Sequence, residues 1–257
     1  MRVVRFAFSP TWLLLLILAA AGLLLGRAVW YDVHQSLEAM TPALFGKVVV
    51  IDAGHGGYDP GVLGTGDSQE ADINLVIAKK LEEYCRQAGM TVLMSRTTDQ
   101  ALADTKAEDL RLRAQLGESA DLFISLHCNG YPDSDTLHGA QVFYQKGNEA
   151  GQLLAETIQS SLQQTLENTD RTALPHSDSY LLKHITAPAA IVEMGFLSNP
   201  EEETLLQNET YQWQMAWGIY QALNTFFQVE DSNQPTHSIP EKESTPTSGG
   251  NDPTAIL

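Results

Sequence analysis

The chain has 257 residues, a hydrophobic content of 43% and a formal net charge of −17. This length allows one well-buried domain with extensions at its ends. Because acidic side chains greatly outnumber basic ones, the composition argues against binding to nucleic acid, and it provides no general attraction for an anionic polymer. Cys85 and Cys128 are too few for a disulfide framework; the sequence leaves their pairing open, and two buried free thiols are the simpler interpretation.

Residues 1–30 carry an apolar stretch, "WLLLLILAAAGLLLG", that begins at Trp12. With the apolar residues just before it, this stretch makes about 20 mostly apolar residues, long enough to span a bilayer. Arg2 and Arg5 precede it, which places the rest of an anchored chain outside the cytoplasm. A cleavable signal peptide is the alternative, but three more leucines follow the small residues, so the cleavage site is poor. We therefore expect a membrane anchor and an extracytoplasmic domain.

After a polar connector at 31–45, residues 46–228 alternate between strand and helix patterns. Strands are predicted at 47–53, 91–96, 121–127, 139–145, 179–184 and 189–195, and helices near 70–88, 108–117, 149–168 and 210–227. This alternation predicts a single α/β domain with a mixed, mostly parallel central sheet flanked by helices. The runs "VVVI", "LFISL" and "AAIV" are apolar enough for central strands that are covered on both faces.

The chain ends in residues 229–257, which are rich in proline, serine, threonine and acidic side chains. Apolar residues are almost absent until the last two positions. Such a segment cannot bury enough apolar surface to fold, so we expect a disordered acidic tail.

The glycine-rich turn in "VVVIDAGHGG" follows the first predicted strand. A dinucleotide-binding fingerprint would need a third glycine where Asp59 stands, and a P-loop would need a lysine after Gly61, so both phosphate-binding interpretations fail. The turn instead places His55 just beyond the carboxyl end of a strand, where open α/β sheets bind ligands. Alone, a histidine there is more often structural than metal-binding.

Glu70 opens the first predicted helix and has two interpretations. Residues 67–70 resemble a capping box, in which Glu70 would fold back onto the helix start. Positions 70, 73, 77, 81 and 84 nevertheless form one stripe, whose last four members face the core. Glu70 therefore heads the buried face, where a carboxylate needs a cationic partner, and no lysine or arginine lies on that stripe. A metal ion would meet this need.

His127 and Glu193 lie at the ends of two more predicted strands. His127 closes the third strand and shares a face with Phe123 and Ser125. Glu193 lies near the end of "AAIVE", and an acidic residue in so apolar a strand is costly unless it is paired or functional. The two residues are therefore expected at the same sheet edge as His55.

Two histidines and two carboxylates at one sheet edge indicate a zinc hydrolase. A catalytic zinc ion takes three protein ligands, often two histidines and a glutamate, and keeps one position for water. His55, Glu70 and His127 suit the ligand role, and Glu193 suits the general base that accepts the proton of that water. The pattern is not the helical H-E-x-x-H, which excludes that group of metallopeptidases.

The same residues carry a resemblance to a known family. The motifs "VVVIDAGHGGYDPGVLG", "EADINL", "FISLHCNG" and "AAIVEMGFLSNP" together resemble zinc-dependent N-acetylmuramoyl-L-alanine amidases of the amidase-3 type, over roughly residues 47–227. The resemblance implies that His55, Glu70 and His127 bind zinc and that Glu193 is the catalytic base. It also implies cleavage of peptidoglycan at the amide between N-acetylmuramic acid and the L-alanine of the stem peptide.

The arrangement is also similar to the sporulation amidases of endospore formers. The N-terminal apolar segment, the lack of wall-binding repeats and the stretch at 109–133 carry this similarity. It implies action before a deacetylase, so that muramic δ-lactam forms in the spore cortex for germination, and a location in the cell or spore envelope. Cys128 departs from the apolar or small residue expected after the metal histidine, and we interpret it as a spectator.

Three questions stay open at this stage. A zinc peptidase that cuts within the stem peptide would use the same chemistry, and a wall-binding protein with an inactive site is a further alternative. The sequence also does not decide whether the site is preassembled or holds zinc only when an activating protein partner binds.

Overall fold

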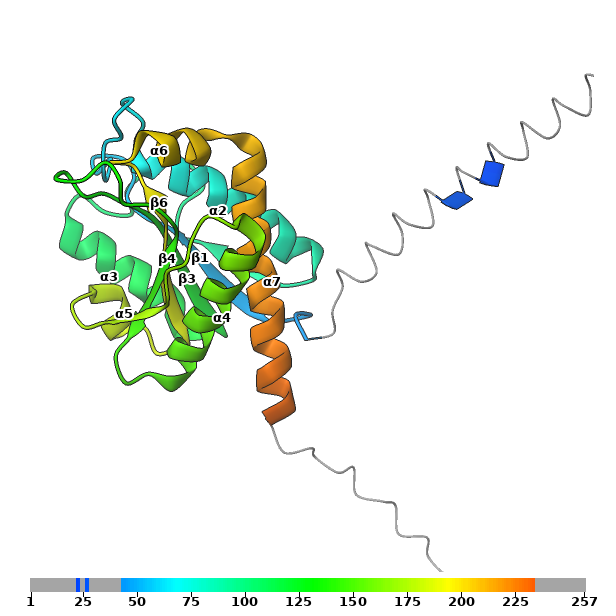
Figure 1. Cartoon of the computed structure of the whole chain (residues 1–257). Helices are drawn as coiled ribbons and strands as arrows, with labels where there is room; N and C mark the ends of the chain where they lie inside the picture. The colour runs from blue at the N-terminus through cyan, green and yellow to red at the C-terminus, as the bar shows by residue number, and fades with distance from the viewer. Residues whose placement is uncertain (1–21, 24–25, 28–42, 234–257) are drawn as a thin grey trace, which may run out of the picture.

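In a computed structural model, residues 22–23, 26–27 and 43–233 are described, and residues 43–233 form one α/β domain around a six-stranded sheet (Figure 1). The strands are β1 (Val48–Ala53), β2 (Thr91–Met94), β3 (Leu122–Asn129), β4 (Gln141–Gln145), β5 (Leu174–His176) and β6 (Ala189–Phe196). Their order across the sheet is β2-β1-β3-β6-β4-β5. All neighbours pair in parallel except β4 and β6, which are antiparallel. The predicted mixed, mostly parallel sheet is thus confirmed.

Helices cover both faces of this sheet. They are α2 (Glu70–Gln87), α3 (Lys106–Leu116), α4 (Glu149–Leu166), α5 (Tyr180–His184), α6 (Pro200–Gln207) and α7 (Glu209–Asn233), with a 3-10 turn η1 (Gly117–Ser119) after α3. In Figure 1, α3 and α5 lie on the left of the sheet, whereas α2, α4 and α7 lie on the right. The sheet is therefore the middle layer of a three-layer domain.

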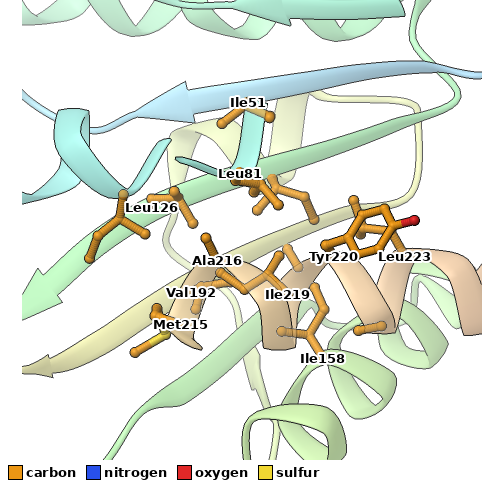
Figure 2. Packing of buried hydrophobic residues seen from close by; sticks show 14 of the residues in the cluster. Ile51, Leu81, Leu126, Ile158, Val192, Met215, Ala216, Ile219, Tyr220 and Leu223 are labelled. Atoms are coloured by element: carbon orange, nitrogen blue, oxygen red, sulfur yellow. The ribbon is translucent and has the colours of Figure 1, made fainter. Parts of the chain in front are cut away.

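The larger core lies between the sheet and α2, α4 and α7. Alternate residues of the central strands point to this side, for example Ile51, Leu126 and Val192, and all three are fully buried. Figure 2 shows them facing Ala216 and Ile219 of α7. The central strands are apolar on both faces, which fits a sheet that helices cover on both sides.

The smaller core on the opposite face is built by α3 and α5. Val50 and Phe123 point to this side and pack with Leu181 and Leu182 of α5. Side chains alternate along a strand, so the same face carries Asp52 of β1 and Ser125 and His127 of β3. The polar site thus continues an apolar face rather than interrupting the larger core.

Several elements differ from the sequence-based expectation. Residues 179–184 were predicted as a strand, which is wrong: they form α5, because the Ser179 side chain accepts a hydrogen bond from the Leu182 N–H (3.3 Å) and caps a short helix. Neither β5 nor α6 was predicted. The last helix continues through Asn233, so residues 229–233 are helical rather than part of a tail. Leu44, assigned to the connector, is fully buried in the core.

The predicted N-terminal anchor lies almost entirely outside the described residues, as do residues 234–257. Within the described ranges, no helix combines the length and the apolar character needed to cross a membrane. The anchor therefore stays a prediction.

Candidate metal centre

The carboxyl ends of β1, β3 and β6 bring three of the four candidate residues to one edge. These strands are adjacent and parallel, so their carboxyl ends coincide. His55 follows β1 by two residues, and His127 of β3 pairs directly with Glu193 of β6. The edge expected from the sequence is thus the edge at which the side chains meet.

His55 is held in a left-handed backbone conformation, with φ of 62°. Few non-glycine residues adopt this region, and such residues cluster at functional sites. Its ring lies between two carboxylates: Nδ1 is 2.9 Å from Asp59 Oδ2, at ion-pair distance but without hydrogen-bond geometry, and Nε2 is 3.1 Å from Glu70 Oε1. A carboxylate behind a histidine is the usual arrangement that orients a metal ligand.

Glu70 connects the two histidines. It is 2% exposed, and its Oε1 lies 2.9 Å from His127 Nδ1. Its Oε2 accepts a hydrogen bond from the Val62 N–H (2.8 Å). Gln69 is the N-cap residue of α2 and makes no side-chain capping bond, so Glu70 is not part of a capping box. Burial alone would raise the pKa of Glu70, but hydrogen bonds with His127 and His55 hold it well below its usual value.

A register shift between β3 and β6, with the extra residue on β6, leaves a backbone donor of β3 free for this carboxylate. The pairing register between β3 and β6 shifts between His127 and Asn129. The intervening Cys128 N–H therefore points out of the ladder and donates to Glu70 Oε1 (3.1 Å). The Cys128 side chain is buried, and burial raises the pKa of its thiol well above the ordinary value, which supports its interpretation as a spectator.

The three residues fit a zinc ion. One ligand atom from each of His55, Glu70 and His127 lies within 4.8 Å of the others. Two histidines and a glutamate are a donor set of catalytic zinc sites. Beside them, Glu193 Oε2 is buried and has no hydrogen-bond partner among the described residues. Burial raises the pKa of Glu193 to about 7, an effect that Glu70 reinforces and His127 opposes. An orphaned buried carboxylate of this kind is suited to general acid–base chemistry.

Two buried arginines that the sequence analysis missed hold the turn that carries His55. Arg113 of α3 donates to the carbonyl oxygen of His55 (2.7 Å) and to Asp52 Oδ1 (2.7 Å). Arg96 donates to the carbonyl oxygen of Gly54 (3.0 Å). Asp52 is a charged residue inside the apolar run of β1, and this was the one signal in the sequence that could have indicated a buried cationic partner.

A family model for N-acetylmuramoyl-L-alanine amidases matches residues 49–225, which include all four residues of the site. The chain belongs to this amidase family. It is 40% identical, over 204 residues, to the germination-specific N-acetylmuramoyl-L-alanine amidase of Bacillus subtilis, an alignment that covers 76% of this chain and 85% of that protein. The resemblance drawn from the four sequence motifs is thereby confirmed.

Solved amidase structures share the fold. The CwlD amidase from Clostridioides difficile, solved in complex with the GerS lipoprotein, superposes with a TM-score of 0.67 at 34% identity, over 72% of this amidase and 100% of that chain. The catalytic domain of the CwlV amidase from Bacillus (Paenibacillus) polymyxa gives a TM-score of 0.64 at 31% identity, over 71% and 99% of the two chains.

Proposed function

We propose that this amidase hydrolyses peptidoglycan at the bond between N-acetylmuramic acid and L-alanine, with zinc held by His55, Glu70 and His127 and with Glu193 as the general base. The observation that carries this proposal is the orphaned, buried Glu193 carboxylate beside three convergent ligand atoms. A zinc ion bound there supplies a Lewis acid that polarises an amide carbonyl and acidifies water.

The residues of this chain have distinct tasks in that reaction. Asp59 lies behind the ring of His55, and the nitrogens of His55 and His127 that face Glu70 Oε1 would bind the zinc ion together with that oxygen. Glu193 accepts a proton from the attacking water and passes it to the leaving amine nitrogen of L-alanine. With a pKa of about 7, Glu193 can both take up and release that proton near neutral pH.

Two substitutions separate the roles of ligand and base. We expect His127→Ala to lose stoichiometric zinc, because one of three ligands is removed. Glu193→Gln should keep zinc and lose at least about a hundredfold in kcat, the contribution typical of a general base. The measurements are metal analysis and turnover on purified peptidoglycan, with and without chelator. Unchanged turnover in Glu193→Gln would refute the assigned base.

Mass analysis of the fragments tests the bond that is cut. The proposal requires free stem peptides that begin with L-alanine and muramic acid that has lost its peptide. Shortened stems that remain attached to the glycan would instead identify a zinc peptidase, and binding without any product would identify an inactive wall-binding protein.

The germination-specific relative supports a role in spore cortex maturation and germination. Expression of this amidase in a spore former that lacks its own germination-specific amidase should restore muramic δ-lactam to the spores, measured by digestion and mass analysis. The Glu193→Gln variant is the matched control, and it should not restore the lactam.

We also propose that residues 1–30 anchor the amidase in the membrane with the domain outside the cytoplasm, on the strength of the apolar stretch after Arg2 and Arg5. The chain should then pellet with membranes and be released when residues 1–30 are deleted. The solved complex of a relative with a lipoprotein supports a protein partner for this amidase as well.

A further inference from the structure

The net charge of −17 raises a question about substrate binding. The stem peptide released by the proposed function carries carboxylates, and a strongly acidic protein repels them at long range. Binding of the peptide therefore depends on cationic groups placed locally, within the cleft itself.

Lys106 is such a group. The cleft that contains the three metal ligands and Glu193 has a volume of about 420 Å³, and among the described residues that line it Lys106 is the only lysine or arginine. Its side chain is 68% exposed, and its Nζ lies 3.5 Å from Asp59 Oδ2. An exposed ion pair of this kind contributes little free energy, so the ammonium group can exchange partners with a ligand at low cost.

The position of Lys106 is fixed by the element that carries it. Lys106 is the first residue of α3, and α3 is tied to the sheet by Arg113, whose guanidinium is buried between Asp52 and Asp109. Arg113 is therefore fully engaged and does not compete for a ligand. The backbone of Lys106 is therefore fixed by α3, while its ammonium group is exposed to solvent and can turn toward a ligand.

The other end of the cleft has a different character. Beyond Val62 and Gly130 the cleft continues into a shallow cavity of about 280 Å³, whose described lining has no charged side chain. Leu63 and Tyr131 are more than half exposed there. An uncharged surface with an exposed aromatic ring suits the apolar face of a sugar better than an anionic peptide. The cleft thus has one cationic end and one neutral end.

We propose that Lys106 binds a carboxylate of the stem peptide and so orients the substrate, with the peptide toward α3 and the glycan toward Tyr131. This inference rests on the proposed function and adds a specificity-determining residue to it. Asp59 keeps its contact with His55 and its hydrogen bond from the Gly61 N–H when Lys106 turns to the substrate.

A pair of soluble muramoyl peptides tests the inference. The two differ only at the second residue of the stem, which is D-glutamate with a free carboxylate in one and the neutral D-isoglutamine in the other. The wild type should prefer the carboxylate form by about tenfold in kcat/KM, the scale of one hydrogen bond to a charged group. In Lys106→Gln the ratio should fall to about one, since the charge is gone, and Lys106→Arg should keep the preference.

A binding measurement makes the test independent of turnover. In the Glu193→Gln background, calorimetric titration should show the same preference, and the additional Lys106→Gln substitution should remove it. Lys183→Gln is the matched control, because Lys183 is also an exposed lysine beside an aspartate (3.8 Å from Asp178) but does not line the cleft.

Two results would overturn the inference and leave the proposed function intact. One is a wild type that cleaves both peptides equally well. The other is an equal loss on both peptides in Lys106→Gln, which would show that the lysine acts through Asp59 on His55. A wild type that cleaves neither peptide between the sugar and L-alanine would contradict the proposed function itself, and the inference with it.

Discussion

Gly54 lies directly before His55, and a Cβ added to it would lie 2.2 Å from Cε1 of the His127 ring. Any side chain at this position therefore displaces the ring of His127, a proposed metal ligand. Glycine is needed here for close approach and not for backbone freedom, because the φ of Gly54 lies outside the left-handed region.

Gly54→Ala should lose zinc, as expected for His127→Ala, and it should lower the free energy of unfolding by about 1–3 kcal/mol through overpacking. Metal analysis and denaturant titration measure the two effects. Gly147→Ala is the control: its φ is +85°, but no atom lies within 4 Å of the added Cβ, so it should cost stability and leave zinc binding intact. Stoichiometric zinc in Gly54→Ala would contradict this account.

At the scale of elements, α6 holds the loop that leads to Glu70, the proposed metal ligand on α2. The Glu203 carboxylate accepts hydrogen bonds from the hydroxyls of Thr65 and Ser68 (2.5 Å each) and from the Gly66 N–H (2.8 Å). This loop ends at Glu70. A helix distant in sequence therefore fixes the approach of the chain to the site.

The pKa of Glu203 gives this clamp a pH dependence. Burial would raise the pKa, but the hydrogen bonds from Ser68 and Thr65 hold it below the ordinary value of 4.5. A carboxyl group with a lowered pKa in the folded state stabilises the protein above about pH 4.5, and this contribution is lost as the pH falls through the folded-state pKa.

Glu203→Gln should therefore lower the free energy of unfolding by about 2 kcal/mol at pH 7, the scale of hydrogen bonds to a charged group. The difference between wild type and variant should shrink as the pH falls below about 4.5, as measured by denaturant titration across the pH range. Glu201→Gln, two residues earlier on α6 and exposed, should show neither effect. A pH-independent difference in Glu203→Gln would count against the clamp.

At the scale of the whole molecule, the three proposed ligands come from separate parts of the chain. His55 follows β1, Glu70 begins α2 and His127 lies in β3. An ion that binds all three stabilises only the folded state. At a hundredfold excess of zinc over Kd this amounts to about 2.7 kcal/mol.

Chelation should consequently lower the Tm of the wild type by about 5–10 °C, the shift expected for that free energy in a domain of this size. Thermal unfolding with and without chelator measures it. His127→Ala should show no such shift, and an equal shift in both proteins would place the stabilising ion elsewhere.

The convergence of the four candidate residues was predictable because each breaks a local pattern: a histidine in a glycine turn, a carboxylate on a buried stripe, and polar residues at the ends of apolar strands. Arg96 and Arg113 were not, because they act on backbone carbonyl oxygens far away in sequence, and such contacts leave no periodic signal. The helix α6 had a signal that went unused, since Asn199 caps it, Pro200 opens it and acidic residues fill its first turn.

Both ends of the domain leave it at the pole opposite the cleft. The chain enters β1 at its amino end, where Lys47 lies 3.6 Å from Asp231 near the end of α7, whereas the ligands lie at the carboxyl end of the same strand (Figure 1). Six residues of β1 span about 20 Å between these poles. With the proposed anchor on this side of the domain, the amidase would hydrolyse only the layer of peptidoglycan that lies close to the membrane. A reporter fused after residue 233 would leave the cleft with the candidate metal centre unobstructed.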